Sequence, residues 1–266
     1  MLVAAGVFLQ AGSDYYKAQR ELAGQILGEA GTLLGGAVRH ETLALPAHSV
    51  AQGLHDLAER ERAQLLIVGS THRGALGRVL AGDTATALLH GSPCPVAIAP
   101  HAYQPPAEGL EQVGVAFDGR EESQRALGAA AALASLAGAR LRLLAVAEPP
   151  GVAGTEVVAD VTYQSVMEEI RRELREALEG ALASLPESQP AEAELIEGRT
   201  APALSEAANS LGLLAVGSRG YGPLGRVLLG STAAHLAHGA PCPLLVVPRG
   251  ADWELGRAEP LAGGKG

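Results

Sequence analysis

The sequence predicts an α/β protein of two tandem domains, each a parallel sheet covered by helices on both faces. Three observations predict this class. A shift of 148 residues superposes residues 69–100 on residues 217–248 without a gap, and 18 of the 32 positions are identical. Short β-rich runs alternate with helical segments, and consecutive parallel strands need a crossover helix. The 266 residues and the 47% hydrophobic content are enough for two cores.

The second half of the chain follows this alternation throughout. Its longest expected helix is amphipathic, because Val166, Ile170 and Leu174 recur at helical spacing with charged residues on the other face. We therefore expect five strands and four helices. In chain order these are strand 113–117, helix 123–137, strand 141–147, helix 163–185, strand 191–197, helix 202–210, strand 213–216, a helix from 231 and strand 243–247.

The first half matches this pattern only from partway in, because nothing in it corresponds to VGVAFDGREESQRALGAAAALASL. We expect its first strand and first helix to be absent, and we expect the true start codon to lie upstream of Met1. The alternative is a domain that works with a gap in mid-sheet, which would expose backbone donors. The remaining elements are expected at 1–9 (the second strand or its end), 14–34 (long helix), 37–43, 65–68 and 96–99 (third to fifth strands).

The domain boundaries follow from the repeat and from a Pro-rich polar linker, HAYQPPAEGLEQ. They place an incomplete first domain at 1–104 and a complete second domain at 105–249, followed by a tail at 250–266 that we expect to be disordered.

Composition argues against several classes of partner. A formal net charge of -9 without a Lys/Arg cluster argues against nucleic acid. No apolar stretch approaches the ~20 residues of a membrane span, and no signal peptide is recognised, so we expect a cytoplasmic protein. Cys94 and Cys242 occupy the same repeat position in Pro-Cys-Pro settings and are expected to be small buried residues. His90 and His238, which also share a repeat position, are expected to pack or to cap a helix.

A glycine-rich loop, GSRGYGPLGRVLLGST at 217–232, follows an expected strand. In open α/β sheets, ligands bind beyond the carboxyl ends of the strands. Gly220 would let the main chain approach a ligand, and Gly230-Ser231-Thr232 would open a helix with a hydroxyl N-cap, an arrangement that suits a polyphosphate. The alternative is an ordinary strand-to-helix turn with a Ser cap.

Two common nucleotide motifs do not fit this loop. The chain has no G-x-x-x-x-G-K-[ST] sequence and only two lysines, Lys17 and Lys265, which excludes a Walker-type NTPase. A G-x-G-x-x-G pattern occurs at 220–225, but it contains Pro223 and no carboxylate follows about 20 residues later to hold a ribose.

The loop fits the pattern G-x2-G-x9-G-[ST] of the ATP-binding universal stress proteins. VAFDGREESQRAL also resembles the family's opening strand, and HGAPCPLLVVP resembles its last strand. The resemblance implies a Rossmann-like, adenine nucleotide alpha hydrolase-like fold with strand order 3-2-1-4-5. It also implies pairing of the two domains through their last strands and a possible homodimer.

Carried onto this sequence, the resemblance implies an ATP site in the second domain, with Mg2+ held by the phosphates. Asp118 would then lie near the adenosine, although with Glu121 three residues later it also has the spacing of a capping box. Arg120 departs from the family, which often has Ser there. The implied ligand-binding residues are Asp118, Ala147 beside the base, Gly217 near the ribose, and Gly220, Gly230, Ser231 and Thr232 around the phosphates.

The first copy keeps Gly69 and Gly82 of the motif but differs at two positions. Asp83 replaces the Ser, and its carboxylate is itself a good N-cap that would repel a phosphate charge 4 Å away by ~1–4 kcal/mol. His72 replaces the second glycine and adds a side chain where close backbone approach is needed, with donation to a phosphate by His72 or Arg73 as the alternative. We therefore expect a degenerate first site that is empty or altered.

The sequence favours a nucleotide-dependent stress-response regulator that binds adenine nucleotide in its second domain. Two alternatives stay open: a slow ATPase, although the loop holds no evident general base, and a scaffold that acts by dimerising without nucleotide.

Overall fold

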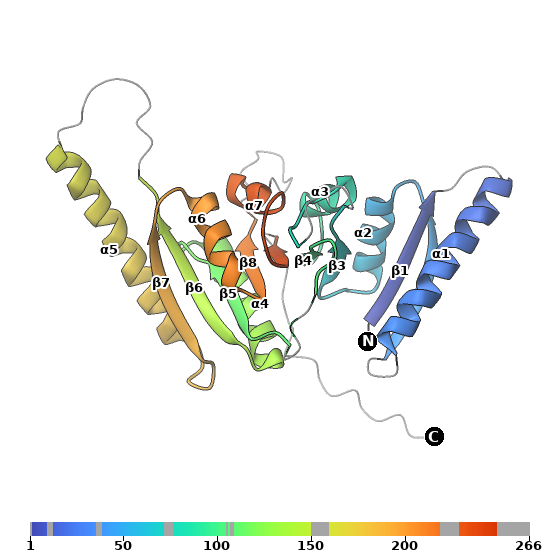
Figure 1. Cartoon of the computed structure of the whole chain (residues 1–266), viewed down its shortest axis with the longest axis horizontal. Helices are drawn as coiled ribbons and strands as arrows, with labels where there is room; N and C mark the ends of the chain where they lie inside the picture. Colours follow the sequence, from blue (N-terminus) through green and yellow to red (C-terminus); the bar gives the residue numbers. More distant parts are fainter. Residues whose placement is uncertain are drawn as a thin grey trace. The chain divides into compact units, whose positions relative to one another are not determined.

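The computed structural model describes residues 2–9, 13–35, 39–71, 77–104, 106, 109–149, 160–218 and 229–248 (Figure 1). Its chain divides into two compact units, Met1–Ala63 and Gln64–Gly266, each with its own sheet. No helix in the described part of the chain combines the length and the apolar character that crossing a membrane needs.

The first unit is a parallel strand pair with two helices. Strands β1 and β2 pair in register from Leu2 opposite His40 to Leu9 opposite Ala47. Helix α2 begins after Ser49, whose hydroxyl accepts the N–H of Gln52 at 3.1 Å and so caps the helix. The elements are β1 (Leu2–Leu9), α1 (Ser13–Leu34), β2 (His40–Ala47) and α2 (Val50–Arg60).

The second unit contains a seven-stranded sheet of order β3-β4-β9-β8-β5-β6-β7. All of its neighbouring strands are parallel except β4 and β9, which are antiparallel. Its elements are β3 (Leu66–Gly69), α3 (Asp83–Leu89), β4 (Val96–Ala99), β5 (Gln112–Ala116), α4 (Glu121–Ala137), β6 (Arg140–Ala147), α5 (Asp160–Ser184), β7 (Ala191–Glu197), α6 (Thr200–Ala207), the 3-10 helix η1 (Ala208–Ser210), β8 (Leu213–Gly217), α7 (Ser231–Leu236) and β9 (Leu244–Val247).

The predicted α/β class and strand order are confirmed in the second copy of the repeat. There the strands lie in the order β7-β6-β5-β8-β9, which is 3-2-1-4-5 when they are numbered within the copy. The expected elements are present with ends that shift by a few residues. The largest shift is in β2, expected at 37–43 and described at His40–Ala47, because the strand continues alongside β1 to its end.

The strands of the first copy fall into two parallel pairs that belong to different sheets, β1–β2 and β3–β4. In the second copy the equivalents of these pairs are joined by β5, which lies between β6 and β8. No described strand of the first copy corresponds to β5. The prediction that the first copy lacks its opening strand therefore agrees with the described strands.

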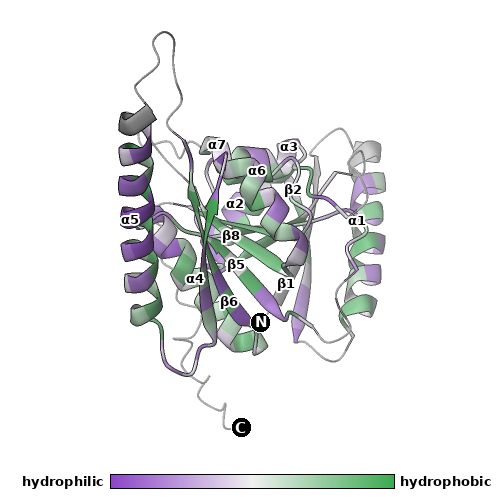
Figure 2. Cartoon of the chain, turned by 60° about the vertical axis from the view of Figure 1, so that its left-hand side comes forward, coloured by the Kyte–Doolittle hydropathy of each residue, from purple (hydrophilic) through white to green (hydrophobic). Residues whose placement is uncertain are grey.

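The second copy has helices on both faces of its sheet. Helices α4 and α5 lie on one face, and α6 and α7 lie on the other (Figures 1 and 2). The hydrophobic runs of β5 and β8 stand out between these layers in Figure 2. This is the doubly wound arrangement in which ligands bind at the carboxyl ends of the strands.

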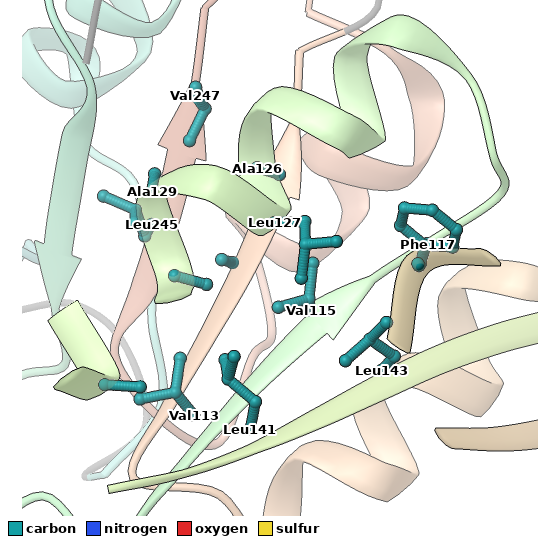
Figure 3. Close-up of a cluster of buried hydrophobic side chains, with 14 of the residues drawn as sticks. Val113, Val115, Phe117, Ala126, Leu127, Ala129, Leu141, Leu143, Leu245 and Val247 are labelled. Carbon is teal, nitrogen blue, oxygen red and sulfur yellow. The ribbon is translucent and has the colours of Figure 1, made fainter. Parts of the chain in front are cut away.

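The main core lies between the sheet and α4. Alternate residues of β5 and β6, among them Val113, Val115 and Leu141, meet the alanine-rich face of α4 (Figure 3). Ala126 and Ala129 of α4 are fully buried. Because alanine has a small side chain, α4 packs close to the sheet, and this closeness determines where the first turn of α4 lies at the strand ends.

The two copies meet where β4 and β9 pair. Val96, Ala97 and Ile98 lie opposite Val246, Leu245 and Leu244 in this antiparallel pair. Beside it, the segment before α3 bonds to the end of α7: the N–H of Val79 donates to the carbonyl of Ala240 at 2.8 Å, and the N–H of Ala81 donates to the carbonyl of Ala237 at 2.7 Å.

The repeated Cys and His residues have the structural roles that were expected. Cys94 and Cys242 are both buried and free. The Nδ1 of His90 bonds to the carbonyl of Thr86, and that of His238 to the carbonyl of Ala234, each over 2.7 Å. Each His therefore satisfies a carbonyl at the end of its own helix.

Candidate functional site

A cavity of about 430 Å3 opens at the carboxyl ends of β5, β6 and β8. The chain turns there from β5 into α4, and the described residues at the start of α7 lie at the same edge of the sheet. Helices α5 and α6 supply its side walls. Its position is the one that an open parallel sheet offers to a ligand.

Five of the residues predicted for the nucleotide site line this cavity together: Asp118, Gly217, Gly230, Ser231 and Thr232. They come from the ends of two neighbouring strands and from the start of α7. Gly220 was predicted beside the phosphates and lies outside the described residues, as do Arg219 and Arg226 of the same loop.

Ala147 was predicted at the end of its strand beside the base, and its side chain is not among those that line the cavity. It is fully buried, while Val146 and Glu148, its neighbours on either side, line the cavity. Successive strand side chains point to opposite faces, so a difference of one position reverses the direction. The carbonyl of Ala147 accepts the N–H of Gly198 at 3.2 Å.

Asp118 lies in a tight turn between β5 and α4. Its Oδ1 accepts the backbone N–H of Arg120 at 3.1 Å, and its Oδ2 lies 3.6 Å from a guanidinium nitrogen of Arg120. Gly119 between them has a φ of +78°, which favours glycine. The capping-box interpretation of Asp118 and Glu121 is wrong, because the N-cap of α4 is Arg120 and Glu121 is already its first helical residue. The carboxylate is thus held at the cavity by the turn.

Gly217 ends β8 at the point where the first turn of α4 passes over the sheet. A Cβ at this position would lie 2.6 Å from the carbonyl oxygen of Glu122 and 2.8 Å from its carbonyl carbon. These are backbone atoms that cannot move aside cheaply. The glycine is therefore needed for close packing of α4, whether or not a ribose also lies against it.

The prediction that a hydroxyl group caps the start of α7 is wrong. Gly230 is the N-cap, with extended backbone (φ -65°, ψ 154°), and Ser231 is the first helical residue. The same holds in the first copy, where Gly82 is the N-cap of α3 and Asp83 is helical. Ser231 and Thr232 line the cavity, and no side chain caps the start of α7.

The sequence did not identify the apolar walls of the cavity. Val146 from β6, Ile170 and Leu174 from α5, and Leu204 from α6 line it. Ile170 and Leu174 were recognised only as part of the amphipathic pattern of their helix. Apolar walls on separate elements suit a flat ring with polar groups at its edge.

Glu148 is a second residue that the sequence did not identify. Its Oε2 accepts the backbone N–H of Thr200 at 3.1 Å and also accepts the Thr200 hydroxyl, so it holds the start of α6. The hydroxyl first and the N–H second lower the pKa of the Glu148 carboxyl below its usual value. Glu148 is thus a fixed carboxylate at the cavity.

The described lining of the cavity is acidic. It includes four carboxylates and one guanidinium: Asp118, Glu122, Glu148 and Glu173, with Arg120. Carboxylates accept hydrogen bonds from hydroxyl and amine groups. Because its lining is acidic, this part of the cavity suits the sugar and base of a nucleoside better than bare phosphates. Within the described ranges, no group of three or more metal-binding side chains gathers.

Comparison with known proteins decides the family. The model of the universal stress protein family matches residues 4–100 and 109–248. The chain belongs to the universal stress protein family. A universal stress protein of Mycobacterium bovis is 32% identical over 202 residues, which are 75% of this chain and 69% of that protein. One of Thermus aquaticus is 34% identical over 136 residues, 50% of this chain and 95% of that protein.

Solved structures of universal stress proteins share the fold. One from Archaeoglobus fulgidus DSM 4304 superposes with a TM-score of 0.65 at 23% identity and covers 94% of this chain and 88% of that chain. A structure described as a universal stress protein of Pseudomonas aeruginosa UCBPP-PA14 gives a TM-score of 0.62 at 18% identity, over 92% of this chain and 82% of that chain. At these identities the likeness extends to the fold alone.

The two universal stress protein segments differ at the glycine motif. Both segments end the strand with a glycine, Gly69 in β3 and Gly217 in β8. They differ at the first residue of the following helix, which is Asp83 in α3 and Ser231 in α7. The carboxylate of Asp83 thus lies at the helix start, where it complements the helix dipole. His72 lies outside the described residues, as does the tail 250–266.

Proposed function

We propose that this universal stress protein binds an adenine nucleotide, ATP with Mg2+ held by its phosphates, in the cavity of its second segment. The nucleotide would act as a regulatory ligand. The observation that carries this proposal is the convergence of Asp118, Gly217 and residues 230–232 on one cavity at the strand ends. Residues of the family motif that are far apart in the sequence are thereby brought to one place.

The walls of the cavity support a nucleoside. Val146, Ile170 and Leu204 offer apolar surface to a planar base. Asp118 offers a carboxylate, held by Arg120, that can accept the hydroxyl groups of a ribose. The base then lies toward β6 and α6, and the sugar lies toward the turn after β5.

The start of α7 supports the phosphates. Gly230 leaves the backbone bare, and Ser231 and Thr232 place two hydroxyl groups at the cavity. The carboxylates on the nucleoside side repel an uncompensated polyphosphate, because like charges a few ångströms apart cost ~1–4 kcal/mol. This favours a nucleotide whose phosphates carry Mg2+.

A regulatory role is favoured over catalysis by how two of the four described cavity carboxylates are held. Asp118 accepts the N–H of Arg120 on one oxygen and Glu148 accepts two donors from Thr200 on one oxygen, so each has a structural partner that fixes its position. A general base must be available to take a proton from the attacking group. Slow ATP hydrolysis remains the alternative, and release of phosphate that Ser231→Asp abolishes would support it.

We also propose that the segments 1–104 and 105–249 act as a pair through their last strands. The antiparallel β4–β9 pair supports this. The first segment then serves as a partner whose own site is degenerate, because Asp83 brings a negative charge to the position of Ser231. A homodimer and a cytoplasmic location are part of the same proposal.

Ser231→Asp tests the proposed site directly, since it gives the second segment the residue of the first. We expect it to weaken Mg-ATP binding roughly 5- to 1000-fold, the range that a repulsion of ~1–4 kcal/mol implies. Ser188→Asp is the matched control, because Ser188 is exposed in the turn before β7, at the opposite end of the strands. Equal binding by both variants and the parent protein in a calorimetric titration would contradict the site.

A further inference from the structure

Glu148 lines the cavity and connects the end of β6 to the first residue of α6 by hydrogen bonds. Glu148 directly follows β6, and Thr200 opens α6. Both the hydroxyl and the backbone N–H of Thr200 donate to the same carboxylate oxygen, Oε2. The side chain of Glu148 is thus fixed at the cavity before any ligand arrives.

The two donations use up one of the two carboxylate oxygens. A carboxylate oxygen has two lone-pair sites, and the two donors from Thr200 fill those of Oε2. Among the described residues, none donates a hydrogen bond to Oε1. Glu148 therefore offers one oxygen, and not the pair that a bidentate partner needs.

The neighbouring walls determine what can lie beside this oxygen. Val146 stands two residues before Glu148 on the same strand face, and Leu204 stands one turn after Thr200 on α6. Together with Ile170 they give apolar walls to the cavity that Glu148 also lines. A flat heterocycle packed against these walls would present its edge to the carboxylate.

We propose that Glu148 selects the base, by accepting a hydrogen from the exocyclic 6-amino group of a purine on Oε1. This rests on the proposed nucleotide site and names the feature that selects its ligand. Adenine offers one amine hydrogen to one oxygen. Hypoxanthine and guanine place a carbonyl oxygen at the same position, which repels the carboxylate. Guanine's N1–H and N2–H2 pair also needs two acceptor oxygens, and Thr200 occupies one of them.

The test compares Mg-ATP with Mg-ITP, which has a carbonyl where ATP has the amine. We expect the parent protein to bind ATP roughly 10- to 100-fold more tightly than ITP, the factor that one hydrogen bond to a charged group provides. In Glu148→Gln the amide can donate to the carbonyl of ITP, so we expect the preference for ATP to fall to about threefold or less. Calorimetric titration gives both affinities.

Glu173→Gln is the matched control, because it removes the same charge from the same cavity on α5. We expect this variant to change both affinities by a similar factor and to keep the preference for ATP. A loss of preference in Glu173→Gln together with retention in Glu148→Gln would overturn the assignment to Glu148.

The parent protein alone keeps the proposal testable if Glu148→Gln does not fold. The triphosphate of purine riboside lacks the 6-amino group and carries nothing in its place, and we expect it to bind roughly 10-fold or more weakly than ATP. Equal affinity for ATP, ITP and this analogue would overturn the role of Glu148 while leaving the nucleotide site intact. Failure of the parent protein to bind any of the three would overturn the proposed function itself.

Discussion

Ala97 of β4 and Leu245 of β9 lie opposite each other in the antiparallel pair, and they are the same position of the 148-residue repeat. On either side, Val96 faces Val246 and Ile98 faces Leu244, so each pair is the repeat image of the other. A register centred on one repeat position has local twofold symmetry, as in an isologous interface. The β4–β9 pair thus has the local symmetry that two identical strands would have in a dimer.

The β4–β9 pairing predicts that buried side chains of these two strands contribute to the free energy of unfolding. Ile98→Ala removes a fully buried side chain of β4 and should lower the free energy of unfolding by about 2–5 kcal/mol. Ile67→Ala is the matched control, because Ile67 lies on neighbouring β3 with 59% of its surface exposed. It should change stability by about 0.5 kcal/mol or less. Equal losses in denaturant unfolding would contradict the junction as described.

The contact between Gly217 and α4 predicts a sharp difference between two glycines. Gly217→Ala should destabilise the fold by about 1–3 kcal/mol, because its Cβ would meet the backbone of Glu122. Gly128→Ala places the same methyl group inside α4, where nothing lies within 4 Å, and should stabilise by up to about 1 kcal/mol. Thermal unfolding of the two variants measures this difference, and a neutral Gly217→Ala would show that α4 does not press on the strand end.

The buried cysteines should be inert in the folded protein. Burial raises the pKa of the Cys94 thiol and raises that of Cys242 to about 12. The thiolate is the reactive form, so both thiols should react with an aromatic disulfide reagent at pH 8 only as fast as the protein unfolds. Urea should release both thiols together. Rapid reaction of Cys242 in the native state would contradict its burial.

Glu148 should make stability depend on pH in one direction. In the folded protein the Thr200 hydroxyl first and the Thr200 N–H second lower the pKa of the Glu148 carboxyl below its usual value. Its contribution is therefore fully present above the ordinary carboxyl pKa and is lost as the pH falls through the lower, folded value. The difference in melting temperature between the parent protein and Glu148→Gln should be largest near pH 7 and should shrink toward pH 3. A difference that grows on acidification would contradict the sign of this shift.

Much of the fold could be predicted from sequence because the signals are local. The helical spacing of Ile170 and Leu174 and the short apolar runs around Val113 and Val246 indicate which element each belongs to. The repeat then placed the same elements in the first segment. The helix at 231 was predicted, but its cap was assigned one residue late, to Ser231 instead of Gly230. Sequence patterns define helix ends only to within a few residues.

The candidate site was harder to predict because its geometry depends on contacts between distant residues. The need for glycine at Gly217 comes from Glu122, which belongs to another element. The bond that fixes Glu148 comes from Thr200, 52 residues away. The tip of β6 illustrates a different limit: the sequence locates the strand end at Ala147, but it does not show that the side chains of Val146 and Glu148 line the cavity while that of Ala147 is buried.

The central claim is a working nucleotide site in the second segment and a degenerate one in the first. The most direct measurement is the nucleotide released by acid from freshly purified protein and from protein incubated with Mg-ATP, identified by mass and counted per chain. We expect close to one adenine nucleotide per chain, and we expect Ser231→Asp to lose it. A value near two would contradict the degenerate first site, and none, with none taken up from Mg-ATP, would contradict the nucleotide site altogether.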